Sequence, residues 1–501
     1  MTENLEQKPS IKKNAMYNMI MTVVGLLVPI ITFPYFARIL LPEGLGINSF
    51  LTGFVGYFII FASLGIPIYA VRQCAMYQND KHNLSQNFQE IYILNVVFAI
   101  ISFFTLVTIS FFIEEIYRHY FLIIFIAIEG FLRAINAVWL LQAKEKYKFL
   151  SIRTMILTCL QIVFLFSFVR SPEHLYRYVL IISSLGVISS IVSILYARKF
   201  VSFKRLQKYN FKRHLKPIFL FLLLVLGGSV IANLGTVMLG FMLGEEYVGL
   251  YSVGIKIARM ILVGVASIIT VLVPRITFYV ENNKVDDFRK LLARAVNVIC
   301  IIAIPIVLFL AIYAYDIILL LLGYEFTGSA IVLRIDAAII FIATLTNIIG
   351  LQYLIPLKKE RFVIVVVSIA AVMCLILNII LIPILGIIGA AIATLIAEIL
   401  VLTVELIYVK KDVWWLFSKI KIARIAILLA MAIGLILLSL FVNLSSLFNL
   451  LIGGAFFMIC MTLLVLNSGD ESIKAMLDKV LKRKKVVAEK IEGVNDAEDK
   501  D

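Results

Sequence analysis

Residues 362–409 decide the class of protein: FVIVVVSIAAVMCLILNIILIPILGIIGAAIATLIAEILVLTVELIYV. Almost every side chain is apolar, and the turn signal lies between Pro383 and Gly386, near the middle. Each half is about as long as the ~20 apolar residues that a helix needs to cross a bilayer. Backbone groups in lipid are satisfied only within a helix or a closed barrel, and the stretch lacks the alternation of barrel strands. It therefore predicts two membrane-spanning helices, 362–383 and 386–409.

The rest of the chain has the same character. Of its 501 residues, 62% are hydrophobic and only 15% are charged, against about 25% in a soluble domain. The pattern predicts an all-α integral membrane protein of about 14 transmembrane helices. The predicted spans lie near 15–37, 46–70, 88–112, 119–141, 153–170, 176–196, 217–243, 248–274, 291–321, 330–356, 362–383, 386–409, 421–442 and 447–467.

The basic residues predict the orientation of these spans. With a cytosolic N-terminus, 37 of the 46 Lys and Arg residues lie on the cytosolic side, five lie within spans and four lie outside. Cytosolic loops of membrane proteins are enriched in Lys and Arg. We therefore expect a multi-pass protein of the bacterial cell membrane with both termini in the cytosol.

Charge and span order also predict the organisation of the chain. The basic connection between the two groups of six spans carries eight Lys and Arg residues. Beside a bilayer, such a segment is expected to contact anionic membrane lipids or to enforce the topology, and not to bind nucleic acid. The predicted segments are a cytosolic N-terminus at 1–14, an N-terminal lobe at 15–196, the basic loop at 197–216, a C-terminal lobe at 217–409, two further spans at 410–467 and a charged cytosolic tail at 468–501.

A weak internal repeat links the two groups of six spans. The pattern E-x-x-G-x-x-S occurs at 43–49 and again, 203 residues later, at 246–252. The same offset places Arg72 on Arg275. An offset of six spans preserves direction through the membrane, so it predicts a parallel repeat, as in transporters that bind their substrate between two related bundles.

Five cations fall within predicted spans, and each costs roughly 3 kcal/mol if it faces lipid. Arg294 and Arg334 lie near span ends and can extend to the interface. Arg133 follows Glu129 by one helical turn, so this pair can form an intrahelical ion pair.

Lys256 and Arg259 are the most informative pair of cations. They lie three residues apart, on one face of a helix that has no acid nearby, and well below its outer end. Two unpaired positive charges near the middle of the membrane predict a hydrated cavity that takes an anionic ligand. Among the acids, Glu398 lies deepest, either as a counter-ion or as a site for H⁺ or Na⁺.

Catalysis and metal binding have no support in the motifs. The chain contains no nucleophile elbow, Walker loop or H-E-x-x-H sequence. Its four histidines lie in short polar connections and its five cysteines are scattered. We therefore expect a transporter that is not an enzyme, without a bound cofactor, whose coupling ion is H⁺ or Na⁺.

Three segments resemble a known family. They are PYFARILLPEGLG at 34–46, WLLQAKEKY at 139–147 and IPILGIIGAA at 382–391. They are similar to segments of bacterial polysaccharide flippases of the Wzx type, which belong to the superfamily of multidrug, oligosaccharidyl-lipid and polysaccharide exporters. The second segment differs from the W-x-x-Q-G-x-E pattern of that family by Ala143, which is also small.

The resemblance implies two six-helix lobes that form a V around a central cavity, with two extra helices at the end. It implies movement of an undecaprenyl-diphosphate-linked oligosaccharide from the cytosolic to the outer leaflet, for capsule, exopolysaccharide or cell-wall polysaccharide. The expected ligands of the diphosphate and the sugars are Lys256, Arg259, Arg133, Arg38, Arg334, Asn233, Asn347 and Tyr251, with Glu398 and Glu129 as coupling or counter-ion groups.

Other functions remain open at this point. A multidrug exporter or a peptidoglycan-precursor flippase of the same superfamily would share the fold. A membrane polysaccharide polymerase is the enzyme alternative, but every outer connection is about ten residues or fewer, which is too short to build a catalytic site. A separate polymerase is instead expected as a partner.

Overall fold

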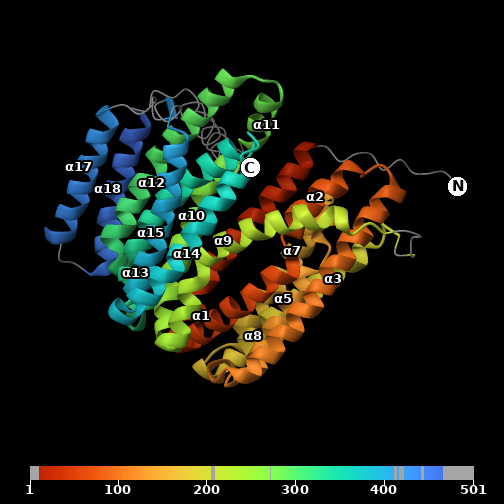
Figure 1. Cartoon of the computed structure of the whole chain (residues 1–501). Helices are drawn as coiled ribbons and strands as arrows, with labels where there is room; N and C mark the ends of the chain where they lie inside the picture. The colour runs from red at the N-terminus through yellow and green to blue at the C-terminus, as the bar shows by residue number, and fades with distance from the viewer. Residues whose placement is uncertain are drawn as a thin grey trace, which may run out of the picture.

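In the part of the chain that it describes, the computed structural model consists of helices joined by short turns and loops (Figure 1). The described residues are 11–202, 204, 209–270, 272–410, 415–416, 422–441 and 445–466. Most of the predicted N-terminal segment, part of the basic loop and the charged tail at 468–501 therefore lie outside the described residues.

The helices of the first lobe follow the predicted spans but often extend beyond them, because a helix continues past the apolar run into the interface. The first lobe consists of α1 (Ile11–Ser63), α2 (Ile66–Met76), α3 (Lys81–Phe112), α4 (Glu114–Tyr117), α5 (Tyr120–Ala134), α6 (Val138–Ala143), α7 (Tyr147–Phe168), a 3₁₀ turn (Pro172–His174) and α8 (Leu175–Ala197).

The second lobe repeats this order of spans, and two more helices follow it. These elements are α9 (Lys212–Met242), α10 (Glu245–Thr270), α11 (Val273–Glu281), α12 (Val285–Leu322), a 3₁₀ turn (Tyr324–Phe326), α13 (Ser329–Thr346), a π-helix (Asn347–Leu354), α14 (Glu360–Leu385), α15 (Ile387–Tyr408), α17 (Ile422–Phe441) and α18 (Ser446–Leu466).

The first two predicted spans form one long element with a sharp break. α1 is helical on both sides of Leu41, which adopts φ 59° and ψ 174°. Pro42 follows, and a residue before proline is disfavoured in the α conformation. The predicted connection at 38–45 is thus reduced to a single non-helical residue, and Arg38 lies inside the helix.

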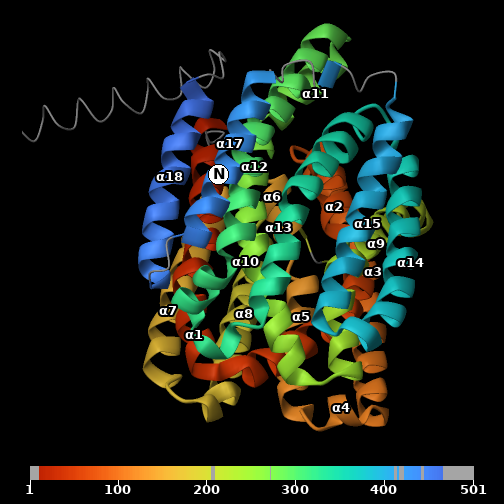
Figure 2. The same cartoon turned by 90° about the vertical axis from the view of Figure 1, so that its left-hand side faces the viewer.

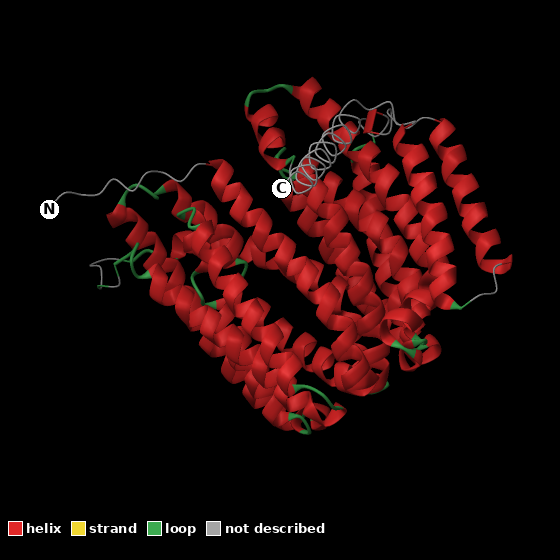
Figure 3. Ribbon diagram, turned by 180° about the vertical axis from the view of Figure 1, so that it is seen from behind, coloured by secondary structure: helices red, strands yellow, loops and turns green. Residues whose placement is uncertain are grey.

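The two lobes meet at one end of the bundle and diverge toward the other (Figures 1 and 3). We call these the Leu41 end, where α1 breaks, and the termini end, where α1 begins. α17 and α18 pack against α12 at the edge of the second lobe (Figure 2).

α9 belongs to both lobes. Near the termini end, Ile218 and Leu222 pack into the apolar core of the first lobe. Further along the helix, Ile231 packs into a core of the second lobe. The Gly227–Gly228 pair lies between these two regions of contact.

The predicted fold class is confirmed. Twelve segments of the described residues are long and apolar enough to cross a membrane, and Ile427–Ser439 is a shorter apolar helix. The segment Leu27–Met76 counts once among the twelve, although its 50 residues and its break at Leu41 provide two crossings. The described part of the chain is all-α, with about 14 membrane helices in two lobes plus two.

Candidate functional site

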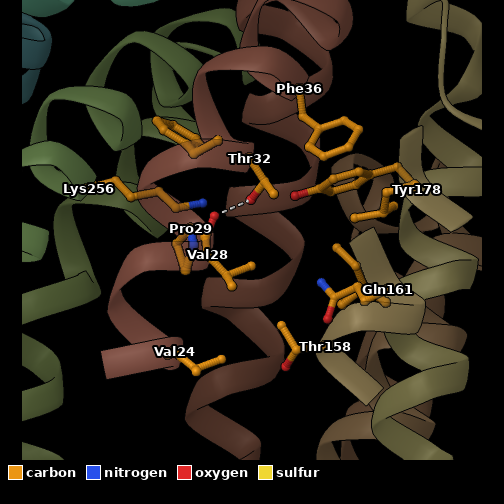
Figure 4. A pocket seen from close by; sticks show the side chains of 13 residues that line it. Val24, Val28, Pro29, Thr32, Phe36, Thr158, Gln161, Tyr178 and Lys256 are labelled. Atoms are coloured by element: carbon orange, nitrogen blue, oxygen red, sulfur yellow. Dashed lines mark hydrogen bonds between the residues drawn. The ribbon is translucent and has the colours of Figure 1, made fainter. Parts of the chain in front are cut away.

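A cavity of about 340 Å³ lies between α1, α7, α8 of the first lobe and α10 of the second (Figure 4). Among the described residues that line it, Lys256 is the only charged one. Pro29 interrupts the hydrogen bonding of α1 beside the cavity, because proline has no backbone N–H to donate. Thr158 and Gln161 on α7 lie across the cavity from Lys256, and the Gln161 amide points into it.

The Lys256 ammonium has a weak partner in this structure. It lies 4.1 Å from the centroid of the Phe33 ring, which is a cation–π contact. Such a contact contributes about 0.5 to 2 kcal/mol, whereas a hydrogen bond between charged groups contributes about 1.5 to 3 kcal/mol. An anion that enters the cavity can therefore replace the ring as the partner of Lys256.

Arg259 has different neighbours, which corrects the expectation of two unpaired charges in one cavity. Its guanidinium donates to Asn233 Oδ1 at 3.1 Å and to the carbonyl oxygen of Ala232, both on α9. It also attracts the carboxylates of Asp336 on α13 and Glu398 on α15. Arg259 is thus part of a polar network inside the second lobe, to which Asn233 belongs as well.

Tyr251 also lies inside the second lobe and not on a hydrated surface, which is a second correction. Its side chain is 1% exposed, and its hydroxyl lies 3.5 Å from Thr394 Oγ1. A Cβ at Gly235 would lie 2.6 Å from the Tyr251 hydroxyl oxygen. The missing side chain at Gly235 therefore provides the space for the tyrosine.

A second cavity, of about 220 Å³, lies within the second lobe. Asn347, Glu398 and Glu405 are among its lining residues, together with the π-helix that begins at Asn347. π-helical segments often occur at functional sites. The expected grouping of Asn347 with sugar-binding residues is thus replaced by a grouping with two glutamates.

Glu405 is the most unusual residue of this second cavity. It is completely buried, and neither carboxylate oxygen has a hydrogen-bond partner among the described residues. A Cβ at Gly350 of the π-helix would lie 2.6 Å from Glu405 Oε1, so the carboxylate packs directly against that backbone. A buried carboxylate without donors favours uptake of a proton or a small cation.

Neither Glu405 nor Asp336 was among the site residues predicted from the sequence. Asp336 is 4% exposed, and its Oδ1 has no hydrogen-bond partner in the described part of the chain. Two signals were available: Asp336 falls inside the apolar run 330–356, and Glu405 follows Glu398 by seven residues, which places both on one helix face.

The remaining predicted cations line neither cavity. Arg133 is 60% exposed and lies 3.6 Å from Glu129 Oε1, as an intrahelical pair. Arg38 donates to the carbonyl oxygens of Leu320 and Leu321, which are unpaired in helix α12 because they lie in its last turn. Arg334 is exposed on α13.

Two repeated lobes of membrane helices with a cavity between them are the arrangement found in many secondary transporters. Comparison with known proteins gives the family. The chain belongs to the polysaccharide biosynthesis protein family, whose model matches residues 11–280. It is 26% identical over 410 residues to the putative O-antigen transporter of Escherichia coli K12, covering 81% of this chain and 98% of that protein.

Further similarities support this assignment. The chain is 30% identical over 168 residues to the probable flippase AglR of Haloferax volcanii, which covers 33% of this chain and 35% of that protein. Among solved structures, the lipid II flippase MurJ in an inward closed conformation has a TM-score of 0.59 at 16% identity, covering 91% of this chain and 99% of that one. An inward-facing MATE multidrug transporter has a TM-score of 0.58 at 15% identity, covering 81% and 96%.

These matches confirm the resemblance to Wzx-type polysaccharide flippases within the exporter superfamily. The two structural matches show a shared fold only, because their sequence identities are low.

Proposed function

We propose that the protein moves undecaprenyl-diphosphate-linked oligosaccharides from the cytosolic to the outer leaflet of the bacterial cell membrane, by alternating access. The observation that carries this proposal is that, of the described residues lining the cavity between the lobes, Lys256 is the single cation and the other polar side chains are neutral. The diphosphate would bind Lys256, hydroxyl groups of the sugars would bind Thr158 and Gln161, and the polyprenyl chain would stay in lipid.

The strength of the contacts that each cation already makes supports an anionic ligand at Lys256. Lys256 is exposed to the cavity, and its contact with Phe33 is weaker than a charge-assisted hydrogen bond. Arg259 and Arg133 already have partners in the structure, so they would assist the diphosphate only after rearrangement. Lys256 is therefore the primary group of the proposed site.

Multidrug export is the second candidate, because the cavity of the second lobe contains Glu398 and Glu405, which would attract cations. The size of that cavity argues against it. Drug-sized ligands occupy sites of roughly 300 to 1,000 Å³, and this cavity measures about 220 Å³. It fits a proton or a small inorganic cation better than an organic one.

We therefore propose that Glu398 and Glu405 couple transport to H⁺ or Na⁺. The charged groups that act on Glu398 are Arg259, which attracts it, and Glu405, which repels it. If a bound ion neutralises one carboxylate, the electrostatic attraction between that group and Arg259 changes. Arg259 is hydrogen-bonded to α9, the helix that packs with both lobes, so the change would be passed on to α9.

The substrate proposal is tested with purified protein in liposomes that contain fluorescent undecaprenyl-diphosphate-linked oligosaccharide, with a membrane-impermeant quencher added outside. Lys256→Ala should weaken substrate binding roughly 10- to 150-fold, because one charge-assisted contact is lost. Lys256→Arg should retain most of the transport. Arg294→Ala, at an exposed position, is the matched control and should flip substrate at the normal rate.

A normal flipping rate in Lys256→Ala would contradict the assignment of the site. Transport of lipid II or of organic cations in place of the oligosaccharide would instead support one of the alternative functions. Association with a separate polysaccharide polymerase, which we also propose, would be tested by cross-linking in membranes.

The proposed orientation has its own test. With both termini in the cytosol, a cysteine at Asn282 should react with an impermeant maleimide from the cytosolic side only, and one at Ser171 from outside only. Both substitutions would be made in a variant that lacks the five native cysteines. The opposite pattern would invert the orientation.

A further inference from the structure

The two copies of the sequence repeat lie against each other at the Leu41 end. Ser49 Oγ donates to Ser252 Oγ at 3.1 Å, and these two serines occupy the same position in the two repeats. A Cβ at Gly46 would lie 1.7 Å from the Glu245 carbonyl oxygen. A Cβ at Gly249 would lie 1.9 Å from the Pro42 carbonyl oxygen. The contact is therefore reciprocal, as expected of a two-fold axis between related surfaces.

These distances mean that the second half of α1 and the first turns of α10 touch backbone to backbone. Real Cβ atoms do not approach other atoms below about 3.0 Å, so neither position accepts a side chain while the helices stay in place. The glycines are thus required by the contact between the lobes and not by the conformation of their own helices.

Two further contacts join the lobes at the same end. Arg38 on α1 donates to carbonyl oxygens in the last turn of α12. His119 Nε2, just before α5, lies 2.5 Å from Glu245 Oε1 on α10. Toward the termini end, the lobes diverge (Figure 3). Leaving aside α9, whose beginning packs with the first lobe, these polar and backbone contacts between the lobes therefore lie together at the Leu41 end.

We propose that the paired repeats form the outer gate of the transporter, closed in this structure, and that the contact between Gly46 and Gly249 sets how tightly it closes. This inference rests on the proposed alternating access and on the proposed orientation, in which the Leu41 end faces outward. Substrate leaves only when α1 and α10 separate at this contact. A side chain at either glycine keeps the gate from closing.

The test uses accessibility, which does not depend on any substrate. Gln161→Cys in a cysteine-free variant places a reporter in the cavity between the lobes. Gly46→Ala and Gly249→Ala should each raise the rate at which an impermeant maleimide labels this reporter from outside, by at least tenfold. The chain provides matched controls: Gly56→Ala on α1 and Gly264→Ala on α10, where a new Cβ meets nothing within 4 Å, should leave the rate unchanged.

A second test, by disulfide cross-linking, does not require the alanine variants to fold. The pair Ser49→Cys and Ser252→Cys should cross-link under a mild oxidant, and the cross-linked protein should stop flipping until it is reduced. Each single cysteine variant, oxidised in the same way, is the control. Normal transport by the cross-linked protein would overturn the gate.

The outcomes separate the gate from the proposed function. Unchanged outside labelling in folded Gly46→Ala and Gly249→Ala proteins would overturn the gate, even if oligosaccharide flipping is confirmed. Raised labelling in the two glycine variants, together with no movement of lipid-linked oligosaccharide by the original protein with Gln161 and both glycines intact, would support the gate and contradict the proposed substrate.

Discussion

Two glutamates, one in each lobe, are completely buried, and their surroundings are opposite. Glu90 on α3 accepts hydrogen bonds from the backbone N–H of Asn210 at 2.9 Å and from Arg213 Nε at 2.9 Å. Its Oε2 also lies 2.8 Å from His214 Nε2. Glu405 on α15 has no hydrogen-bond partner for either oxygen among the described residues.

The difference distinguishes the ion-paired Glu90 from Glu405, for which we propose a role in coupling. The charge of Glu90 is fully used in joining the beginning of α9 to the first lobe. A buried carboxylate without partners stabilises nothing by itself, because its desolvation is not compensated. Glu405 therefore makes sense as a group that binds an ion during the transport cycle, in a lobe that is otherwise built on the same plan.

Removing the carboxylate of Glu90 should have the largest effect. Glu90→Ala leaves the Asn210 N–H, the half-exposed Arg213 and the buried His214 without their acceptor, and each buried donor left unsatisfied costs about 1 to 3 kcal/mol. We expect a large fall in the free energy of unfolding, measured by thermal unfolding in detergent. Glu114→Ala, at an exposed position in α4, should change it by less than about 0.5 kcal/mol. If Glu90→Ala and Glu114→Ala have equal free energies of unfolding, Glu90 is not a structural charge and no longer differs from Glu405 in this respect.

Crowding Glu405 should have a smaller effect. Gly350→Ala would place a methyl group 2.6 Å from Glu405 Oε1, so the carboxylate must move. Overpacking of this kind costs about 1 to 3 kcal/mol. Gly228→Ala is the matched control, since Gly228 lines the same cavity but a Cβ there meets nothing within 4 Å. If Gly228→Ala lowers the free energy of unfolding and Gly350→Ala does not, the Glu405 carboxylate does not pack against Gly350 as described.

Removing one hydrogen bond of His214, which contacts Glu90, should lower the free energy of unfolding by less than the two changes above. The Tyr69 hydroxyl lies 2.7 Å from His214 Nδ1, on the side of the ring opposite Glu90. Tyr69→Phe should lower the free energy of unfolding by about 0.5 to 1.5 kcal/mol. Tyr176→Phe, at a position 48% exposed, is the control and should have no measurable effect. An unchanged unfolding temperature for Tyr69→Phe would mean that the tyrosine does not support the network.

The sequence predicts those features of the molecule that depend on neighbours along one helix. Apolar runs give the spans, and the spacing of Glu129 and Arg133 gives their ion pair. The repeat at 43–49 and 246–252 predicts the relation between the lobes, and the structure adds that its two copies touch.

The site is less predictable because it depends on contacts between helices far apart in sequence. Lys256 and Arg259 are three residues apart, yet one contacts α1 and the other α9. Glu90 and Glu405 are equally buried, and only the folded structure shows which of them has donors. Helical spacing alone contains no information on the neighbouring helices.

The smallest effect on stability, and the sharpest test of the comparison, is expected from Glu405→Gln. The amide keeps the shape of the side chain and removes its charge, and no donor loses its acceptor, because the carboxylate has none in the described structure. We therefore expect a free energy of unfolding within about 0.5 kcal/mol of the original protein, or above it.

The effect of Glu405→Gln on transport should be large by contrast: if Glu405 binds the coupling proton, flipping in liposomes should lose its dependence on a pH gradient. Substituting Na⁺ by K⁺ in the same assay distinguishes a proton from a sodium ion. Glu90→Gln should show the reverse, with weakened folding and an intact pH dependence in whatever protein folds. If Glu405→Gln destabilises the protein as much as Glu90→Ala does, both glutamates are structural and coupling must rely on Glu398 alone.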